Sequence, residues 1–262
     1  MATAAATPTA AGTPAGASAR TRLGATLSWV GMPVFLLVIG IATYLYVSSN
    51  ELDSIEQRTL NSTQLTASLV EHLKLTAVST LLVIVIAIPL GILVTRPGAR
   101  RAVPVILGIG NIGQAIPSFG LITIIVISFG LGFTPVIIGL VAYSALPILR
   151  NTMVGLQQVD PAVIKASRGM GMSTRTVLRQ VELPLAVPVM IAGIRTALVL
   201  NVGTAALATF FGAGGLGFII FQGIQLNRNP VLITGVAMTA GLALLVDYLG
   251  GVAGRVLSPR GL

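Results

Sequence analysis

"KASRGMGMSTRTVLRQVELP", from Lys165 to Pro184, is a compact basic stretch in a chain that is otherwise strongly apolar. It holds four of the chain's 16 lysine and arginine residues, and long apolar runs flank it on both sides. Basic residues beside apolar runs are typical of loops at a membrane surface. The first question is therefore whether the rest of the chain crosses a membrane.

Composition answers that question. Of 262 residues, 54% are hydrophobic and only 9% are charged, and the mean hydropathy is +0.94. A soluble domain carries about 25% charged residues. Apolar runs of about 20 residues, each long enough to cross a hydrocarbon layer, recur along the sequence, and the alternating pattern of a membrane β-barrel is absent. We predict an all-α polytopic membrane protein.

Cysteine and histidine usage narrows the chemistry. The chain has no cysteine, which excludes disulfides and thiolate metal sites, and its single histidine, His72, cannot form a metal site alone. One histidine and seven acidic residues do not supply a credible catalytic set, so the chain is not expected to be an enzyme. The net charge of +9 fits basic cytoplasmic loops better than nucleic-acid binding.

Six membrane spans are predicted from hydropathy. They are Trp29–Val47, Leu73–Thr95, Val103–Leu131, Pro135–Leu149, Ala186–Phe210 and Val231–Val252. The first is longer than the apolar core of about 7–15 residues in a cleaved signal peptide, so we expect it to be retained. The third is too long for one straight helix and contains "NIGQAIPSFG". Because Pro117 lacks a backbone donor, we expect a break around Gly113–Gly120.

Charge predicts the orientation of these spans. With the amino terminus inside, 12 of the 16 basic residues lie on the inner side, three on the outer side, and Arg195 within a span. The positive-inside rule therefore places both termini and the basic stretch in the cytoplasm. The expected division is a disordered cytoplasmic tail (1–28), a first span (29–47), an extracytoplasmic segment (48–67), a membrane core (68–250) and a cytoplasmic tail (251–262).

Local signals predict two short helices in and before the basic stretch. Asp160 can cap free amides and Pro161 suits a first helical position, so a helix should begin there. Gly169 and Gly171 should end it, and Ser173 can cap a second helix.

The second helix should be amphipathic. Arg175 and Arg179 share one face, whereas Val177, Leu178 and Val181 form another. Such an element can lie on lipid headgroups and merely set topology, or it can dock into a soluble partner.

The order of residues favours docking. The stretch resembles the EAA loop of ABC importer permeases: E-A-A, three residues, Gly, nine residues, Ile, one residue, Leu-Pro. Here the pattern becomes Lys165-Ala166-Ser167, Gly171, Val181 and Leu183-Pro184. The spacing matches throughout, but Lys165 replaces the acidic residue and Ser167 replaces the second alanine.

The resemblance covers roughly residues 68–250. The segments "VTRPGAR", "GQAIPSFG", "GMGMS", "VELPLAVPVMIAGIRTA" and "GAGGLG" are similar to those of permeases that import glycine betaine, choline, carnitine and related osmoprotectants. The resemblance implies the type I ABC importer permease fold, located in the bacterial inner membrane. It also implies that this chain forms the translocation pathway for such a solute.

The resemblance further implies partners. Residues 160–184 would dock into a groove on an ATPase and bury their apolar face there. The coupling residues would be Lys165, Ala166, Ser167, Gly169, Gly171, Val181, Leu183 and Pro184. The expected assembly has two cytoplasmic ABC ATPases, a second permease (a copy or a paralogue) and an extracytoplasmic binding protein. This chain would carry no cofactor, since ATP and magnesium would bind the ATPases. Neither lysine lies in a Walker A loop.

Polar residues within the spans are candidates for the pathway. Asn111, Gln114, Ser118, Asn201 and Arg195 are costly in lipid and should face the bundle interior. Gln114 and Ser118, beside Pro117, are the favoured pathway pair, although one such residue more often makes a helix–helix hydrogen bond. Arg195 could extend to the inner surface, and Asp247 could pair with a partner.

The glycine-rich "GAGGLG" satisfies the dinucleotide fingerprint GxGxxG but lacks its preceding strand. We interpret it as a segment packed against neighbouring helices. By resemblance, Gly214 and Gly215 would help to form an outer gate.

Other functions are weaker alternatives. Permeases for methionine and other small solutes share the loop and the glycine-rich segment, so an amino acid is a possible cargo. An ion-coupled secondary transporter would typically show intramembrane carboxylates and an internal repeat. A non-transporting scaffold would explain the basic stretch but not its spacing.

Overall fold

The structure, a computed structural model, describes residues 16–257, and every regular element in that range is helical. The elements are α1 (Gly16–Ser48), α2 (Ser54–Thr59), α3 (Ser62–Thr95), η1 (Arg100–Ala102), α4 (Val103–Ala115), α5 (Ser118–Phe129), α6 (Phe133–Gln157), α7 (Pro161–Gly169), α8 (Thr174–Val177), η2 (Leu178–Glu182), α9 (Leu183–Ala205), η3 (Ala206–Phe211), α10 (Gly217–Gln225) and α11 (Asn229–Leu257).

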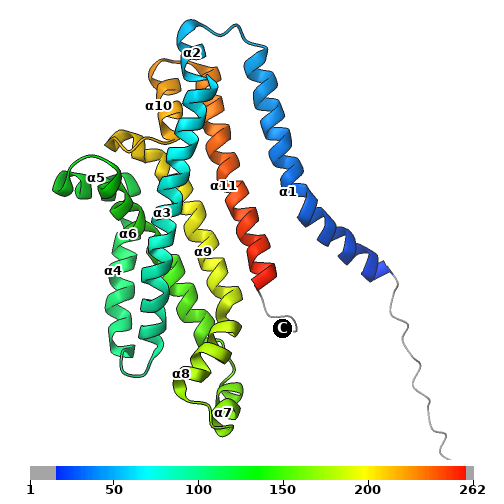
Figure 1. Cartoon of the computed structure of the whole chain (residues 1–262), viewed down its shortest axis with the longest axis vertical. Helices are drawn as coiled ribbons and strands as arrows, with labels where there is room; N and C mark the ends of the chain where they lie inside the picture. Colours follow the sequence, from blue (N-terminus) through cyan, green and yellow to red (C-terminus); the bar gives the residue numbers. More distant parts are fainter. Residues whose placement is uncertain (1–15, 258–262) are drawn as a thin grey trace, which may run out of the picture.

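Four long helices form the centre of the molecule. α6 packs against both α3 and α9, and α9 also packs against α11. Figure 1 shows α7 and α8 at one end of this bundle and α2 and α10 at the other. Small residues allow close helix packing: a Cβ on Gly193 of α9 would lie 2.8 Å from the Pro147 carbonyl oxygen of α6. The all-helical architecture predicted from composition is confirmed.

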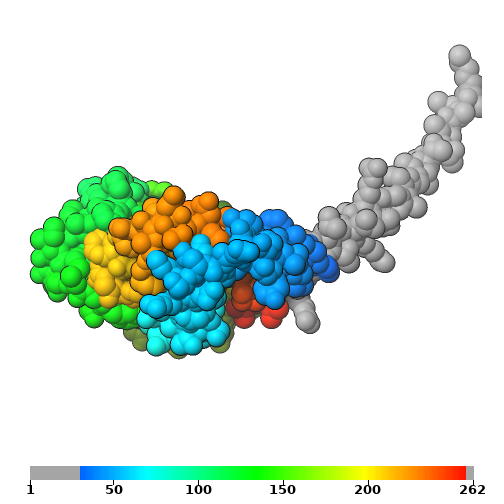
Figure 2. All heavy atoms as spheres, turned by 90° about the horizontal axis from the view of Figure 1, so that it is seen from above, coloured from blue at the N-terminus to red at the C-terminus, as the bar shows by residue number. Residues whose placement is uncertain are grey.

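Helix α1 lies at the edge of the bundle. It packs along α11, and Figure 2 shows it beside the main body. Its apolar stretch Val30–Ser48 is long enough to span a membrane, as predicted. Because α1 begins at Gly16, the expected disordered tail is helical over residues 16–28. Residues 1–15 and 258–262 lie outside the described residues, and they make up half of the two predicted tails.

The third predicted span is broken, as expected. α4 and α5 meet at an angle of 100°, so α5 projects sideways from the bundle (Figure 1). The break falls at Ile116-Pro117: Ile116 is extended, with ψ at 130°, and Pro117 is the N-cap of α5. A proline disfavours helical geometry in the residue before it, which accounts for the position of the break.

Five to six candidate spans stand against the six predicted from the sequence, and α6 is longer than its predicted span. Within residues 16–257, five helices are long and apolar enough to cross a membrane, or up to six if the bent pair counts as one. α6 continues to Gln157, beyond the predicted end of the fourth span at Leu149. Arg150 and Asn151 lower the hydropathy there without interrupting the helix. Asn151 donates to the Pro147 carbonyl one turn earlier, at 2.8 Å.

Candidate coupling segment and glycine loop

Residues 160–184, called the coupling segment below, form two helices joined by a glycine turn. Asp160 accepts a hydrogen bond from the Ala162 amide at 2.7 Å. α7 ends in a Schellman motif: the Gly171 amide donates to Arg168 at 2.9 Å, and the Met172 amide donates to Ser167 at 3.2 Å. Gly171 has a φ of +86°, so it ends the helix as predicted. Gly169 is still helical and does not break it.

The second half of the coupling segment continues directly into a span. Ser173 accepts from the Thr176 amide and caps α8, as predicted. The π-helical turn η2 then leads into α9 without interruption, and the Leu183 amide donates to the Leu178 carbonyl five residues earlier. A π-turn is a rare element that often occurs at functional sites. Nothing in the local sequence predicted it.

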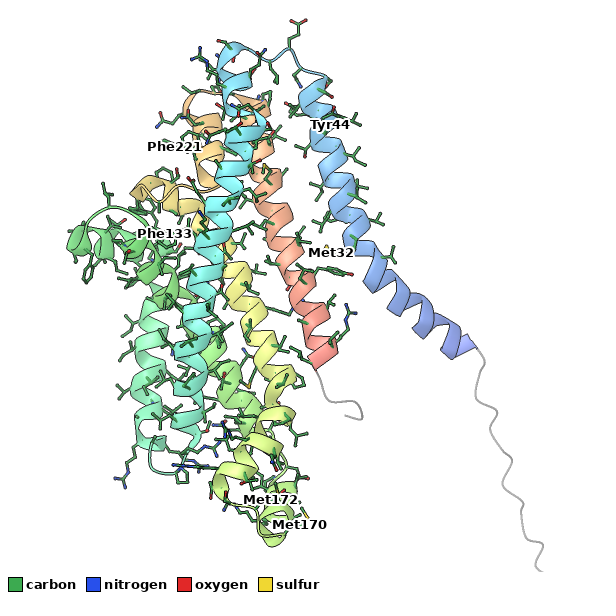
Figure 3. All side chains as sticks on the ribbon, in the orientation of Figure 1. Met32, Tyr44, Phe133, Met170, Met172 and Phe221 are labelled. Atoms are coloured by element: carbon green, nitrogen blue, oxygen red, sulfur yellow. The ribbon has the colours of Figure 1, made fainter. Side chains whose placement is uncertain are left out.

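The two faces of the coupling segment differ in burial. The exposed face carries four cations and a methionine: Lys165, Arg168, Arg175, Arg179 and Met170. Figure 3 places Met170 at the tip of the molecule. The inner face is only partly covered by the chain itself: Val177 is completely buried, whereas Leu178 and Val181 are half-buried. The expected burial of this face in a partner is therefore wrong for Val177, and it stays a prediction for Leu178 and Val181.

An ion pair joins the coupling segment to α3. Nη2 of Arg96 lies 2.6 Å from Oε2 of Glu182, whose side chain is only 5% exposed. Arg96 is the C-cap of α3, and its Nε also donates to the Ile92 carbonyl at 3.3 Å. The pair connects "VTRPGAR" with "VELP", 86 residues apart. The sequence pointed to both segments but not to their contact.

In the N-terminal half of α3, two side chains hold the glycine loop (residues 212–217). Oε2 of Glu71 accepts from the Gly215 amide at 2.9 Å. Nδ1 of buried His72 accepts from the Leu216 amide at 3.2 Å, and its Nε2 lies 3.0 Å from the Val202 carbonyl. This geometry fits a neutral imidazole that carries its proton on Nε2. The loop packs against a neighbouring helix, as expected, but neither Glu71 nor His72 was predicted to hold it.

We expect Gly214→Ala to impair transport more than Gly212→Ala. Both glycines have a φ near +74° (+74° and +73°), so alanine is strained equally at either position. A Cβ on Gly214 would lie 2.1 Å from Oε2 of Glu71, whereas one on Gly212 would meet nothing within 4 Å. Uptake rates of the two variants, normalised to folded protein, measure the contribution of the Glu71 contact. Equal rates would show that this contact is unimportant.

The predicted pathway residues do not form one cluster in this chain. Asn201 is completely buried and donates to Oγ1 of Thr80 at 2.9 Å, a hydrogen bond between α9 and α3. Gly214 and Gly215 belong to the loop held by α3. Asn201 therefore acts as a helix–helix contact here.

Residues near the break in the third span are more accessible. Asn111 is exposed and accepts from Arg150. Gln114 is half-buried and donates to the Tyr143 carbonyl at 3.2 Å. Pro117 is exposed, and Ser118 begins α5. Asn111 is the one exposed polar residue of α4, whose other exposed residues include Val105, Ile109 and Ile112. A polar side chain such as Asn111 is unfavourable in lipid, so we expect it to meet water or protein.

Arg195 and Asp247 pair with each other. Nη2 of Arg195 lies 2.9 Å and 2.8 Å from the two carboxylate oxygens of Asp247, which joins α9 to α11. Gly250 leaves room for the Arg195 side chain, because a Cβ at position 250 would lie 2.6 Å from Cγ of Arg195. The sequence predicted a separate role for each of these two residues. It did not predict that they pair with each other.

Comparison with known proteins gives a consistent result. Residues 87–260 match the family described as "Binding-protein-dependent transport system inner membrane component". The chain is 40% identical over 226 residues to the osmoprotectant import permease protein OsmY of Salmonella typhimurium, covering 86% of this chain and 94% of that protein. It is 40% identical over 192 residues to the choline transport system permease protein OpuBB of Bacillus subtilis, covering 73% and 88%.

A third relative and a solved structure extend the comparison. The carnitine transport permease protein OpuCD of Listeria monocytogenes is 41% identical over 189 residues, covering 72% of this chain and 84% of that protein. Among solved structures, an inward-facing conformation of the MetNI methionine ABC transporter matches with a TM-score of 0.67 and 28% identity. That match covers 76% of this chain and 100% of the other.

Proposed function

Because the chain belongs to the family of binding-protein-dependent ABC transporter permeases, we propose that it forms the translocation pathway for a small osmoprotectant. It is the multi-pass inner-membrane subunit of such a transporter and not the ATPase. Membership implies an ATPase and an extracytoplasmic binding protein as partners. The proposed cargo class is that of glycine betaine, choline and carnitine.

The observation that carries the substrate proposal is the agreement among relatives. Three proteins at 40–41% identity are named for osmoprotectant, choline or carnitine transport. The methionine transporter shares the fold at a lower identity of 28%. An amino acid is therefore the second candidate cargo.

The coupling segment supports the proposed contact with the ATPase. Its exposed face is basic, and its turn is fixed by the Schellman motif at Gly171. Such a face fits an acidic groove, because opposite charges give specificity and speed association. Lys165 is exposed on this face, where an acidic residue on the ATPase would complement it. Two ATPases, one for each of two permeases, complete the proposed assembly.

The proposed orientation places the coupling segment in the cytoplasm. In Figure 1, α1 starts and α11 ends toward the α7 end of the bundle. Both termini would then be cytoplasmic, which agrees with the distribution of basic residues. The region of the break, with exposed Asn111 and Pro117 and half-buried Gln114 and Ser118, would face the second permease and the pathway between the two. That second permease is a copy of this chain or a paralogue.

Reconstitution tests the function. Proteoliposomes containing the permease, its ATPase and its binding protein should take up labelled glycine betaine, choline or carnitine only when ATP is supplied. Labelled methionine serves as the competing cargo. Uptake by this chain alone, driven by an ion gradient, would contradict the proposal and favour a secondary transporter.

A further inference from the structure

Helix α3 makes specific polar contacts at two well-separated positions. At its C-terminal end, Arg96 pairs with Glu182 of the coupling segment at 2.6 Å. In its N-terminal half, Glu71 and His72 accept hydrogen bonds from the amides of Gly215 and Leu216 in the glycine loop. The two positions are 24 to 25 residues apart along the helix. Residues 71 to 96 lie on one continuous helical stretch and its C-cap, so one element contacts both regions.

The contact at Glu182 is suited to transmitting movement. Its carboxylate is almost entirely buried and sits on the π-turn that joins the coupling segment to α9. A protein is strongly destabilised when a buried carboxylate loses its charged partner. Separating Arg96 from Glu182 therefore has a high cost in free energy. When the coupling segment moves, α3 should follow it, because the ion pair then stays intact.

α3 is one continuous helix between these two contacts. Its 34 residues make a helix roughly 50 Å long at about 1.5 Å per residue. Pro89 lies inside it, yet the helix is continuous through that position. Leu75 and Val83 are completely buried along its length. In its N-terminal half, the close fit between Gly214 and Glu71 ties the glycine loop to the same helix.

We propose that α3 transmits movement of the coupling segment to the glycine loop, through Arg96–Glu182 at one contact and Glu71 with His72 at the other. Arg96, Glu182, Glu71 and His72 are then positioning residues for transport. The inference rests on the proposed function. It adds a route from the coupling segment to the glycine loop that is separate from the direct continuation of the coupling segment into α9.

The test measures substrate imported per ATP hydrolysed in reconstituted complexes. Glu182→Gln removes the charge at nearly constant shape, and Arg96→Gln removes its partner. Each should lower this ratio by about tenfold, within the usual range of coupling between sites. Bound ATPase, measured by co-purification, and its hydrolysis rate should change little. Arg96→Lys preserves the charge and should keep the ratio close to that of the wild type.

Asp53→Asn is a matched control. Asp53 pairs with Arg228 at 2.7 Å, away from the two contacts of α3. The hydrogen bond from the Glu56 amide lowers the pKa of Asp53, so this carboxyl group is ionised at neutral pH. Asparagine retains the capping ability of this position. The substrate imported per ATP hydrolysed by the Asp53→Asn variant should equal that of the wild type.

A double variant tests the serial route. If both contacts act through α3, Glu71→Ala combined with Glu182→Gln should lower the ratio no further than the more severe single change. Independent effects would multiply and would overturn the proposal. So would a normal ratio in Glu182→Gln, or a loss of uptake that only follows a loss of folded protein. Failure of the wild-type chain to bind the ATPase would refute the proposed function instead.

Discussion

Replacing Gly171 with valine is expected to abolish ATP-driven uptake while the membrane bundle stays folded. Gly171 has a φ of +86° and closes the Schellman motif that ends α7. A left-handed conformation costs an ordinary residue about 1–2 kcal/mol, and more for a β-branched one. The turn should therefore rearrange and displace Lys165 and Arg168 relative to α8. Nothing lies within 4 Å of a Cβ at this position, so internal packing should survive.

Two substitutions separate turn geometry from side-chain bulk. Gly171→Asn tolerates the left-handed region better than valine and should retain partial uptake. Gly169→Ala adds a methyl group in open space at a helical position of the same predicted docking surface and should lower uptake far less than Gly171→Val. Uptake, co-purification of the ATPase and thermal stability in detergent are measured for all three. Normal uptake by Gly171→Val would show that the turn is not needed for coupling.

Gly217→Ala is expected to prevent stable folding of the α10 end of the molecule. A Cβ on Gly217 would lie 1.7 Å from the carbonyl oxygen of Ala206. That oxygen belongs to the backbone of η3 and cannot move aside as a flexible side chain can. The loss in free energy of unfolding should exceed the roughly 1–3 kcal/mol that is typical of substitutions that overpack an interior. We expect a large fall in the yield of monodisperse protein and in its melting temperature.

Gly203→Ala is the matched control for this change. Gly203 lies in α9, only 14 positions earlier, and a Cβ there would meet nothing within 4 Å. Alanine in a helix is about 0.5–1 kcal/mol more favourable than glycine, so this variant should be at least as stable as the wild type. Equal stability of the two variants would contradict the close approach of η3 and Gly217.

Features set by neighbouring residues could be predicted from the sequence. Asp160-Pro161 started α7, Ser173 capped α8, and Pro117 broke the third span, because each acts on backbone groups within a few positions. The apolar runs likewise predicted the candidate spans. α10 was not predicted, because its nine residues are too few for a span.

Contacts between distant segments could not be predicted in this way. Glu71 meets Gly215 across 144 positions, and Glu182 meets Arg96 across 86. No local periodicity encodes such pairs. The same limit explains the wrong expectation for Val177. An amphipathic pattern shows that an apolar face must be covered, but not whether this chain or a partner covers it.

Chemical labelling of the coupling segment tests the central claim most directly. The chain has no cysteine, so Met170→Cys introduces its only thiol at a position where the native side chain is 76% exposed. Gln225→Cys, at the opposite end, is the control. Maleimide labelling of this chain is followed by mass, with and without the bound ATPase. The ATPase should protect the thiol of Met170→Cys and leave that of Gln225→Cys reactive. Equal labelling of Met170→Cys in the assembled complex and in the isolated permease would contradict docking through the coupling segment.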